Sequence, residues 1–233
     1  IQVANTNDGP VATPINDQAA TEDATFSLDA FSSFSDIDAG DTLTFTATLA
    51  DGSPLPSWLS IDPTPAILSG TPENADVGSI SVTVAATDSQ GATASDTFAI
   101  QISNTNDGPV ATAIDDQTAT EDAAFALNAS TSFSDVDAGD TLSYTATLAD
   151  GSPLPSWLTI DPNTGVLSGT PENADVGSIS VTVTATDSQG TTASDTFGIQ
   201  VANTNDGPVA TAIDDQAATE DATFSLDAFS SFS

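Results

Sequence analysis

The sequence predicts an all-β protein built of tandem β-sandwich repeats, and three observations support this prediction. A block of 99 residues recurs along the chain, hydrophobic and polar residues alternate with a period of two, and turn residues separate the alternating runs. Such alternation is typical of strands that bury one face. No segment keeps the hydrophobic spacing of a helix over ten residues.

The repeat is easiest to follow in the hexapeptide Asn-Thr-Asn-Asp-Gly-Pro, which begins at Asn5, Asn104 and Asn203. Residues 11–109 and 110–208 differ at 21 positions. A period of 99 residues fits a whole domain better than a solenoid unit of about 20–45 residues. We therefore expect the end of a preceding repeat at 1–10, complete repeats at 11–109 and 110–208, and the start of a third at 209–233. The chain begins and ends within a motif and has no Met, so we expect it to belong to a longer protein.

Strands are expected wherever alternating runs lie between turn signals. Residues 79–85 and 97–102 alternate strictly, and Gly- and Pro-containing segments at 50–54 and 70–72 interrupt the pattern. Seven short strands in a domain of this size are typical of an immunoglobulin-like sandwich. In the first repeat we expect them near residues 15–20, 24–29, 42–49, 57–61, 66–69, 79–87 and 93–103.

The charge of the chain excludes several classes of function. The formal net charge is −34, with no Lys, Arg or His. Binding to nucleic acid or to anionic lipid needs basic side chains, so both partners are excluded. No apolar run approaches the roughly 20 residues of a membrane span, so no direct membrane insertion is expected in this segment. Without His, Cys or Lys the chain also lacks the usual acid–base and covalent catalysts, and we expect no enzyme.

Carboxylates gather in turns at matching positions of each repeat. In the first repeat they occur at Glu22-Asp23, at residues 36–41, at Asp88 and in the linker at 104–107. Asp is a common turn residue because its side chain caps nearby backbone, and a surface screened by bulk salt is the alternative interpretation. Ca²⁺, however, takes six to eight oxygen ligands, and four such clusters repeated in the same order favour calcium sites.

At these motifs the chain resembles the cadherin repeats, most closely the dystroglycan-type cadherin-like (Ig-like) domains of large bacterial surface adhesins. The cadherin linker Asp-x-Asn-Asp-Asn-x-Pro is similar to residues 104–109, and the Glu-Asn pair to Glu22-Asp23. The family's Asp-x-Asp matches residues 135–137, and its Ala-x-Asp-x-x-Gly matches residues 185–190. The resemblance covers both complete repeats.

The resemblance implies Ca²⁺ between consecutive repeats, which stiffens the array. Carried over by position, the ligands before the first repeat are Asn5, Asn7, Asp8, Asp36, Asp38 and Asp88. Those between the two complete repeats are Glu22, Asn104, Asn106, Asp107, Asp135, Asp137 and Asp187. Those after the second repeat are Glu121, Asn203, Asn205 and Asp206, a set that lacks the next Asp-x-Asp and should be incomplete.

Two departures from the family pattern bear on the ligand set. Where cadherins carry Leu-Asp-Arg-Glu, this chain has residues 70–76, and either Glu73 or Asp76 could supply the acid; Glu172 and Asp175 are the alternatives in the second repeat. Gly108 stands where the family usually has Asn, which removes a side-chain ligand. We therefore expect fewer or weaker ions than in animal cadherins.

The function that the resemblance implies is a structural spacer or stalk in a bacterial cell-surface or secreted adhesin, whose partners are neighbouring repeats of the same chain. Calcium sites in extracellular modules bind on the order of 10⁻⁴–10⁻³ M, which favours an exported location. The alternative is a calcium-dependent carbohydrate- or protein-binding module that recognises surface glycans or another adhesin.

Overall fold

A computed structural model describes residues 6–38 and 40–231, so the predicted ligand Asn5 lies outside the described residues. The described chain is all-β, with short 3-10 turns as its helical segments. None of these turns is long and apolar enough to cross a membrane. The chain forms two compact units: unit 1 holds residues 1–108 and 135–141, and unit 2 holds residues 109–134 and 142–233.

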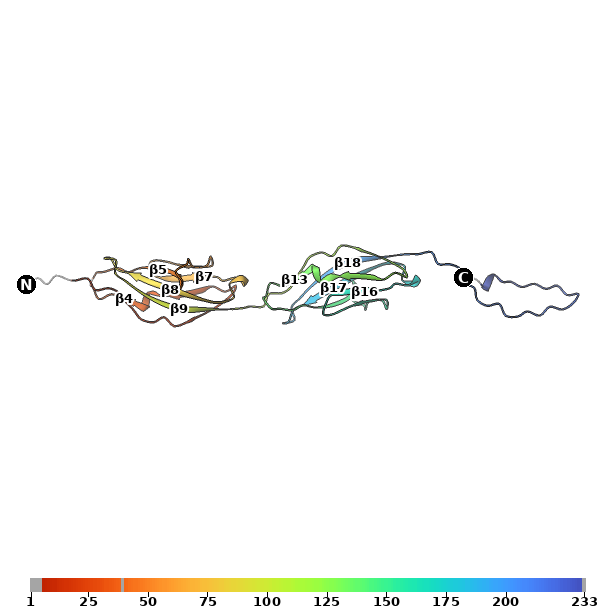
Figure 1. Cartoon of the computed structure of the whole chain (residues 1–233), viewed down its shortest axis with the longest axis horizontal. Helices are drawn as coiled ribbons and strands as arrows, with labels where there is room; N and C mark the ends of the chain where they lie inside the picture. The colour runs from red at the N-terminus through yellow and green to blue at the C-terminus, as the bar shows by residue number, and fades with distance from the viewer. Residues whose placement is uncertain (1–5, 39, 232–233) are drawn as a thin grey trace, which may run out of the picture. The chain divides into compact units, whose positions relative to one another are not determined.

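Unit 1 is a sandwich of a four-stranded and a three-stranded sheet, completed by a short two-stranded pair (Figure 1). The larger sheet has the order β2 (Gln18–Thr21), β9 (Thr93–Ser103), β8 (Gly78–Thr87) and β5 (Thr44–Leu49). The smaller sheet has the order β3 (Phe26–Asp29), β7 (Ile67–Gly70) and β6 (Leu59–Ile61). The pair is β1 (Val11–Ala12) with β4 (Phe34–Ser35). Every pairing is antiparallel except that of β2 with β9, which is parallel.

Unit 2 repeats this topology. Its four-stranded sheet has the order β11 (Gln117–Thr120), β18 (Thr192–Ala202), β17 (Gly177–Thr186) and β14 (Ser143–Leu148). Its three-stranded sheet has the order β12 (Phe125–Asn128), β16 (Val166–Gly169) and β15 (Leu158–Ile160). β10 (Val110–Ala111) pairs with β13 (Phe133–Ser134), and β11 again lies parallel to β18.

The period-two pattern places alternate side chains in a core between the sheets of each unit. Val82, Val84 and Ile100 are fully buried in unit 1. The residues between them face outward, where the hydroxyls of Thr83 and Thr97 lie 2.8 Å apart across β8 and β9. Burying branched apolar side chains on one face contributes roughly 1.5–3 kcal/mol each, which makes this core the main source of stability in a chain without disulfides.

The observed strands confirm the predicted fold class and correct some of the expected bounds. β9 spans the expected residues, whereas β2, β3, β5 and β6 begin two or three residues later. Before β3 the delay has a local cause: Asp23 adopts φ 58°, and Ala24 N donates to Thr21 O at 3.3 Å, which closes a turn. The two-residue strands β1 and β4 were not expected, because two residues cannot display an alternation.

Residues 209–231 repeat the sequence of residues 11–33 almost unchanged but contain no strand. Their large apolar side chains are exposed, with Phe224 at 51% and Phe229 at 87%. Local features remain, among them the 3-10 turn η5 (Phe229–Ser231) and the positive φ of 64° at Asp221.

Candidate metal centre

Glu22 is the most buried carboxylate of unit 1, at 1% exposure. It follows β2, and its N–H extends the pairing with β9 by donating to Ser103 O at 3.1 Å. Its Oε1 accepts from Thr105 N at 2.6 Å. Its Oε2 is buried and has no hydrogen-bond partner. Leaving a buried charged oxygen without a partner costs several kcal/mol, so this atom marks a place where a cation fits.

The linker after β9 lies against the loop of residues 135–141, which belongs to unit 1 although the sequence assigns it to the second repeat. Asp137 accepts from Asn104 Nδ2 at 3.1 Å and from Asp107 N at 2.8 Å. Its own N–H donates to Asp135 Oδ1 at 2.9 Å. The backbone of the linker and the turn of the loop thus fix the orientation of the Asp137 carboxylate.

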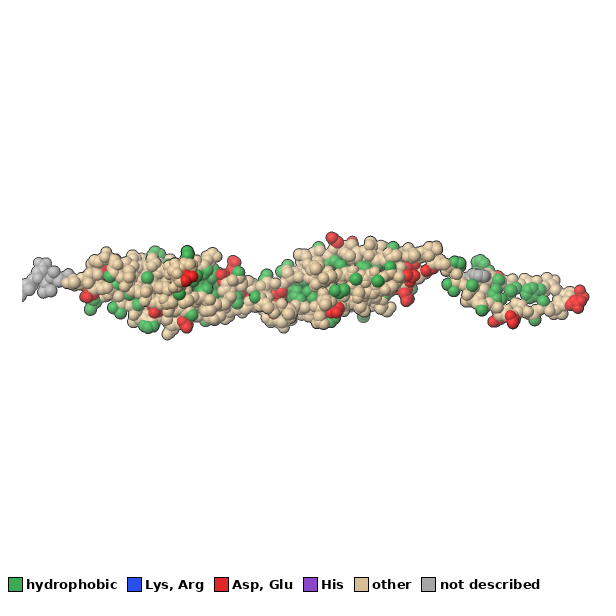
Figure 2. Space-filling model, viewed as in Figure 1, with side chains coloured by type: hydrophobic (Ala, Val, Ile, Leu, Met, Phe, Trp, Pro, Cys, Tyr) green, Lys and Arg blue, Asp and Glu red, His purple; other side chains and the backbone are tan. Residues whose placement is uncertain are grey.

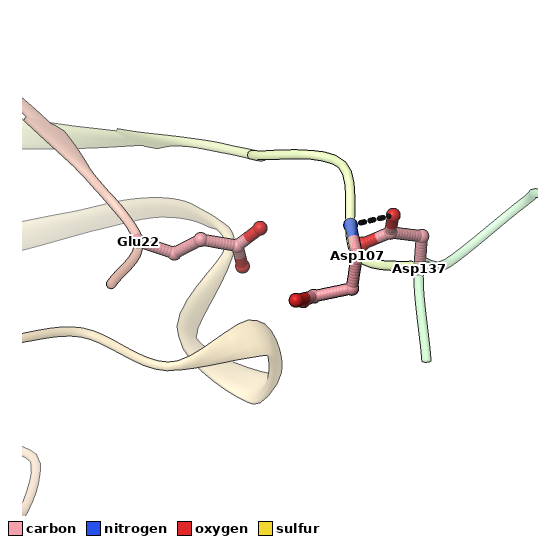
Figure 3. A group of neighbouring side chains, drawn as sticks. All are labelled: Glu22, Asp107 and Asp137. Atoms are coloured by element: carbon pink, nitrogen blue, oxygen red, sulfur yellow. Dashed lines mark hydrogen bonds between the residues drawn. The ribbon is translucent and has the colours of Figure 1, made fainter. Parts of the chain in front are cut away.

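One oxygen from each of Glu22, Asp107 and Asp137 lies within 4.8 Å of the others, and the Glu22 carboxylate points toward the two Asp residues (Figure 3). Two unit charges 4 Å apart repel by about 1 kcal/mol in water and about 4 kcal/mol at an effective dielectric constant of 20. No basic side chain exists in the chain to relieve this repulsion. Carboxylate oxygens in this number suit a hard divalent cation such as Ca²⁺.

A second group forms at the other end of unit 1, where carboxylate oxygens of Asp36, Asp41 and Asp88 lie within 4.8 Å of one another. Asn7 Nδ2 donates to Asp88 Oδ2 at 3.0 Å, and this hydrogen bond is the main cause that holds the pKa of Asp88 below its usual range. Asp8 N donates to Asp38 Oδ2 at 2.7 Å. The loop at 135–141 repeats the arrangement in a third group, formed by Asp135, Asp137 and Asp140.

Unit 2 repeats the Glu22 arrangement at Glu121. This side chain is 2% exposed, its Oε1 accepts from Thr204 N at 2.8 Å, and its Oε2 is buried without a partner. Within the described residues, no group of three carboxylates forms around it. Asp187 is also in unit 2, where it accepts from Gln189 N and Thr191 N. The other predicted ligands lie in the two linkers: Asn106 is half-buried, and Asn203, Asn205 and Asp206 are exposed.

Four residues at these groups were absent from the predicted ligand set. Asp41 and its counterpart Asp140 join the Asp groups, and the recurring Asp-x-Asp-x-Gly-Asp spacing is the signal that could have identified them. Asn74 donates to Asp107 Oδ2 at 2.5 Å, and Asn173 to Asp206 Oδ2 at 2.9 Å. No spacing rule predicts these two Asn contacts, because they join segments 33 residues apart.

The surface around these groups is acidic or neutral. In Figure 2 the red carboxylates stand in separate patches among tan and green surface, and no basic residue accompanies them. Most of the outward-facing side chains on the four-stranded sheets are Ser and Thr. The acids therefore collect mainly in loops and linkers.

Comparison with known proteins gives a family and a fold. Residues 9–103 and 108–202 each match the family described as "Putative Ig domain". The "Serine-rich adhesin for platelets" of Staphylococcus aureus strain MRSA252 is 31% identical over 147 residues, which cover 63% of this chain and 10% of that protein. The chain thus spans a tenth or less of the length of such relatives.

Two solved structures align with most of the chain, and one of them illustrates the fold. Human mucin-like protocadherin EC1-2 aligns at a TM-score of 0.58 and 13% identity, over 84% of this chain and 98% of that chain. An endo-fucoidan hydrolase of glycoside hydrolase family 107 aligns at a TM-score of only 0.39 and 29% identity, over 87% of this chain and 30% of that chain. The first shows a cadherin-like fold, and the second superposes too loosely to bear on activity.

Proposed function

Because the chain belongs to the Ig-domain family that matches both of its repeats, we propose that it is a calcium-binding spacer of a bacterial adhesin. It carries no catalytic site in this proposal. Residues 11–109 and 110–208 act as successive spacer elements, with 1–10 and 209–233 belonging to their neighbours. The adhesin named among its relatives supports an exported, cell-surface location.

The observation that carries the proposal is the buried Glu22 carboxylate. One of its oxygens has no partner, and it faces two further carboxylates in a chain without any basic side chain. A polar group buried in this way is stable only when something compensates its charge. Glu22, Asp107 and Asp137 would hold the cation, and backbone carbonyls or water would complete its ligands.

Calcium is the preferred ion because of the geometry it tolerates. Ca²⁺ accepts six to eight oxygens in flexible arrangements, whereas Mg²⁺ demands a near-ideal octahedron and keeps several waters. The acid groups combine carboxylates with backbone and side-chain amide groups of the linker. Ca²⁺ accommodates such an irregular set of ligands more readily than Mg²⁺ does. In the sequence Glu22 and Asp107 belong to the first repeat and its linker, and Asp137 to the second, so an ion held by all three would restrict the motion of one repeat against the next.

Thermal unfolding of residues 11–208 tests the proposal. An ion that binds the folded state raises the melting temperature by mass action. We expect a rise across a calcium series into the millimolar range, starting from EDTA, and a much smaller rise with magnesium. An equal rise with sodium or magnesium would identify the acids as a salt-tolerant surface and would overturn the calcium function.

The spacer role is tested separately from ion binding. Replacing Asp135 and Asp137 together with Asn should leave both units folded, because neither side chain belongs to a hydrophobic core. Small-angle scattering in millimolar calcium should then show a broader distribution of sizes than for the unchanged chain. Identical scattering of the two proteins would contradict a stiffening role for these residues.

A further inference from the structure

We infer that Asn74 is a positioning residue that holds the Asp107 carboxylate ready for the ion, and that Asn173 does the same for Asp206. The inference rests on the proposed calcium function and deepens it. Asn74 Nδ2 donates to Asp107 Oδ2 at 2.5 Å, and the equivalent distance in unit 2 is 2.9 Å. Neither Asn was among the predicted ligands.

Asn74 lies on a short 3-10 turn that is held by hydrogen bonds between Glu73 and Asp76. It begins η2 (Asn74–Asp76), where Glu73 and Asp76 form a reciprocal capping box. Glu73 N donates to Asp76 Oδ2 at 3.0 Å, and Asp76 N to Glu73 O at 2.8 Å. Of the two acids that the family resemblance offered as ligands, Asp76 thus uses its carboxylate to hold the turn, and Asn74 is the residue of this turn that reaches the linker.

The same turn is tied to the Glu22 segment. Asp23 N donates to Pro72 O at 2.9 Å, and in unit 2 Asp122 N donates to Pro171 O at 2.8 Å. Glu22 and Asn74 thus lie on two segments that a backbone hydrogen bond joins. Because Glu22 also accepts from Thr105 N, the linker is held at two points on either side of Asn106.

A neutral amide is suited to this position. It donates to a carboxylate without adding charge to a group that already repels itself, and hydrogen bonds to charged groups are among the stronger ones. A carboxylate in its place would face Asp107 with like charge until an ion arrived. Asn74 therefore allows Asp107 to be oriented in the absence of the ion.

Unit 2 shows that this half of the site forms without an Asp-x-Asp loop. Glu121 accepts from Thr204 N, and Asn173 donates to Asp206, although no group of three carboxylates forms there within the described residues. The Glu–linker–Asn arrangement is thus a property of each unit alone. Ion binding would then need only the Asp-x-Asp loop to complete a half-site that already exists.

The test compares three variants in the full chain, with calcium affinity measured by titration calorimetry and bound water counted from terbium luminescence lifetimes in H₂O and D₂O. Asn74→Ala should weaken calcium binding roughly tenfold, the size expected for losing one hydrogen bond to a charged group. The number of waters on terbium should stay unchanged, because Asn74 orients a ligand rather than being one. Asn128→Ala is the control, because Asn128 only caps the 3-10 turn Ala129–Ser132 by accepting from Ser130 N at 3.1 Å, and it should leave the measured affinity unchanged.

Asn74→Asp separates positioning from a merely structural role. It should lower the melting temperature of unit 1 in EDTA, because two carboxylates then face each other, yet bind calcium more tightly than the unchanged chain. A loss of stability at every calcium concentration, or Asn74→Ala binding calcium as tightly as the unchanged chain, would overturn the inference. If the unchanged chain binds no calcium, the proposed function itself fails, and the two failures remain distinguishable.

Discussion

Residues 11–33 and 209–231 carry nearly the same sequence but differ in structure. They differ only at Pro14, which becomes Ala212, and at Asn16, which becomes Asp214. In the first segment Phe26 is 7% exposed and lies in β3, whereas its counterpart Phe224 is 51% exposed and lies in no strand. Two small substitutions at the start of the segment do not explain this difference.

The difference separates local from long-range determinants of structure. The Asx-type contact from Phe31 N to Asp29 Oδ1, 2.9 Å, recurs at the same length between Phe229 and Asp227. The strands do not recur, because β2 needs β9 and β3 needs β7, and residues 209–231 find no such partners among the described residues. Turns are therefore encoded within a few residues, while strands form only when the rest of the repeat is in place.

The candidate metal ligand follows the same rule. Glu22 and Glu121 are 1% and 2% exposed, whereas Glu220, in the third copy of the same Thr-Glu-Asp-Ala turn, is exposed. The turn alone does not bury the carboxylate. In the two folded repeats the buried carboxylate accepts from a linker N–H, that of Thr105 or Thr204.

Completing the third repeat should have the largest effect on this comparison. If a copy of residues 135–208 is appended after Ser233, the new repeat should fold and protect Phe224 from chymotrypsin. Protection follows the free energy of opening, so cleavage after Phe224 should slow by at least about a thousandfold for a domain of ordinary stability. Mass spectrometry of timed digests would measure this, with Phe125 of unit 2 as the internal protected reference. Cleavage at an unchanged rate would mean that the segment is intrinsically unable to form strands.

Removing the same aromatic ring from the two segments should have unequal effects. Phe26→Ala should destabilise unit 1 by about 3–5 kcal/mol, because the ring is buried and packs edge-on against Trp58 at 6.2 Å. Phe224→Ala should leave both units unchanged. Urea unfolding followed by Trp fluorescence would measure both, and equal shifts in the two variants would contradict the comparison.

Replacing the buried Glu22 and its exposed counterpart Glu220 should distinguish the effect of burial from the effect of sequence. In EDTA, Glu22→Gln should stabilise unit 1 by about 1 kcal/mol, because it removes one of three clustered charges while keeping an acceptor for Thr105 N. In millimolar calcium the sign should reverse. Glu220→Gln should change neither melting temperature, since the exposed side chain belongs to no such group. A stabilising effect of Glu220→Gln in EDTA would show that net charge alone is responsible.

The smallest expected effect concerns a local turn within a folded unit. Hydrogen bonds from the Ser152 hydroxyl and N–H hold the pKa of Asp150 below its ordinary value, as the corresponding contacts of Ser53 do for Asp51. A carboxyl with a lowered folded pKa stabilises above its unfolded pKa of about 3.9, and this stabilisation is lost as the pH falls through the lowered value. Ser152→Ala should therefore lower the melting temperature of unit 2 slightly at pH 7, with a difference that shrinks below about pH 4. A difference that grows in acid would contradict this assignment.

The fold could be predicted from the sequence wherever the sequence was periodic, either in its hydrophobic pattern or in its repeats. Alternation predicted β9 to its ends, and the 99-residue repeat predicted two equivalent sandwiches. The strands β1 and β4 are too short to alternate, and the exposure of Phe224 depends on partners that a local pattern does not report. Asp41 and Asp140 could have been predicted from the Asp-x-Asp-x-Gly-Asp spacing, but the contact of Asn74 with Asp107 depends on the tertiary fold.

In each unit an early strand pairs in parallel with the last strand, β2 with β9 and β11 with β18, and this pairing has a mechanical consequence. β2 lies near the start of unit 1 and β9 is its last strand, and the two pair in parallel over residues 18–21 and 100–103. If the ends of the unit are pulled apart, the two strands are drawn in opposite directions along their length. The load then acts in shear on all hydrogen bonds of that ladder at once, instead of opening them one after another. Each repeat is thus arranged to resist tension along the chain.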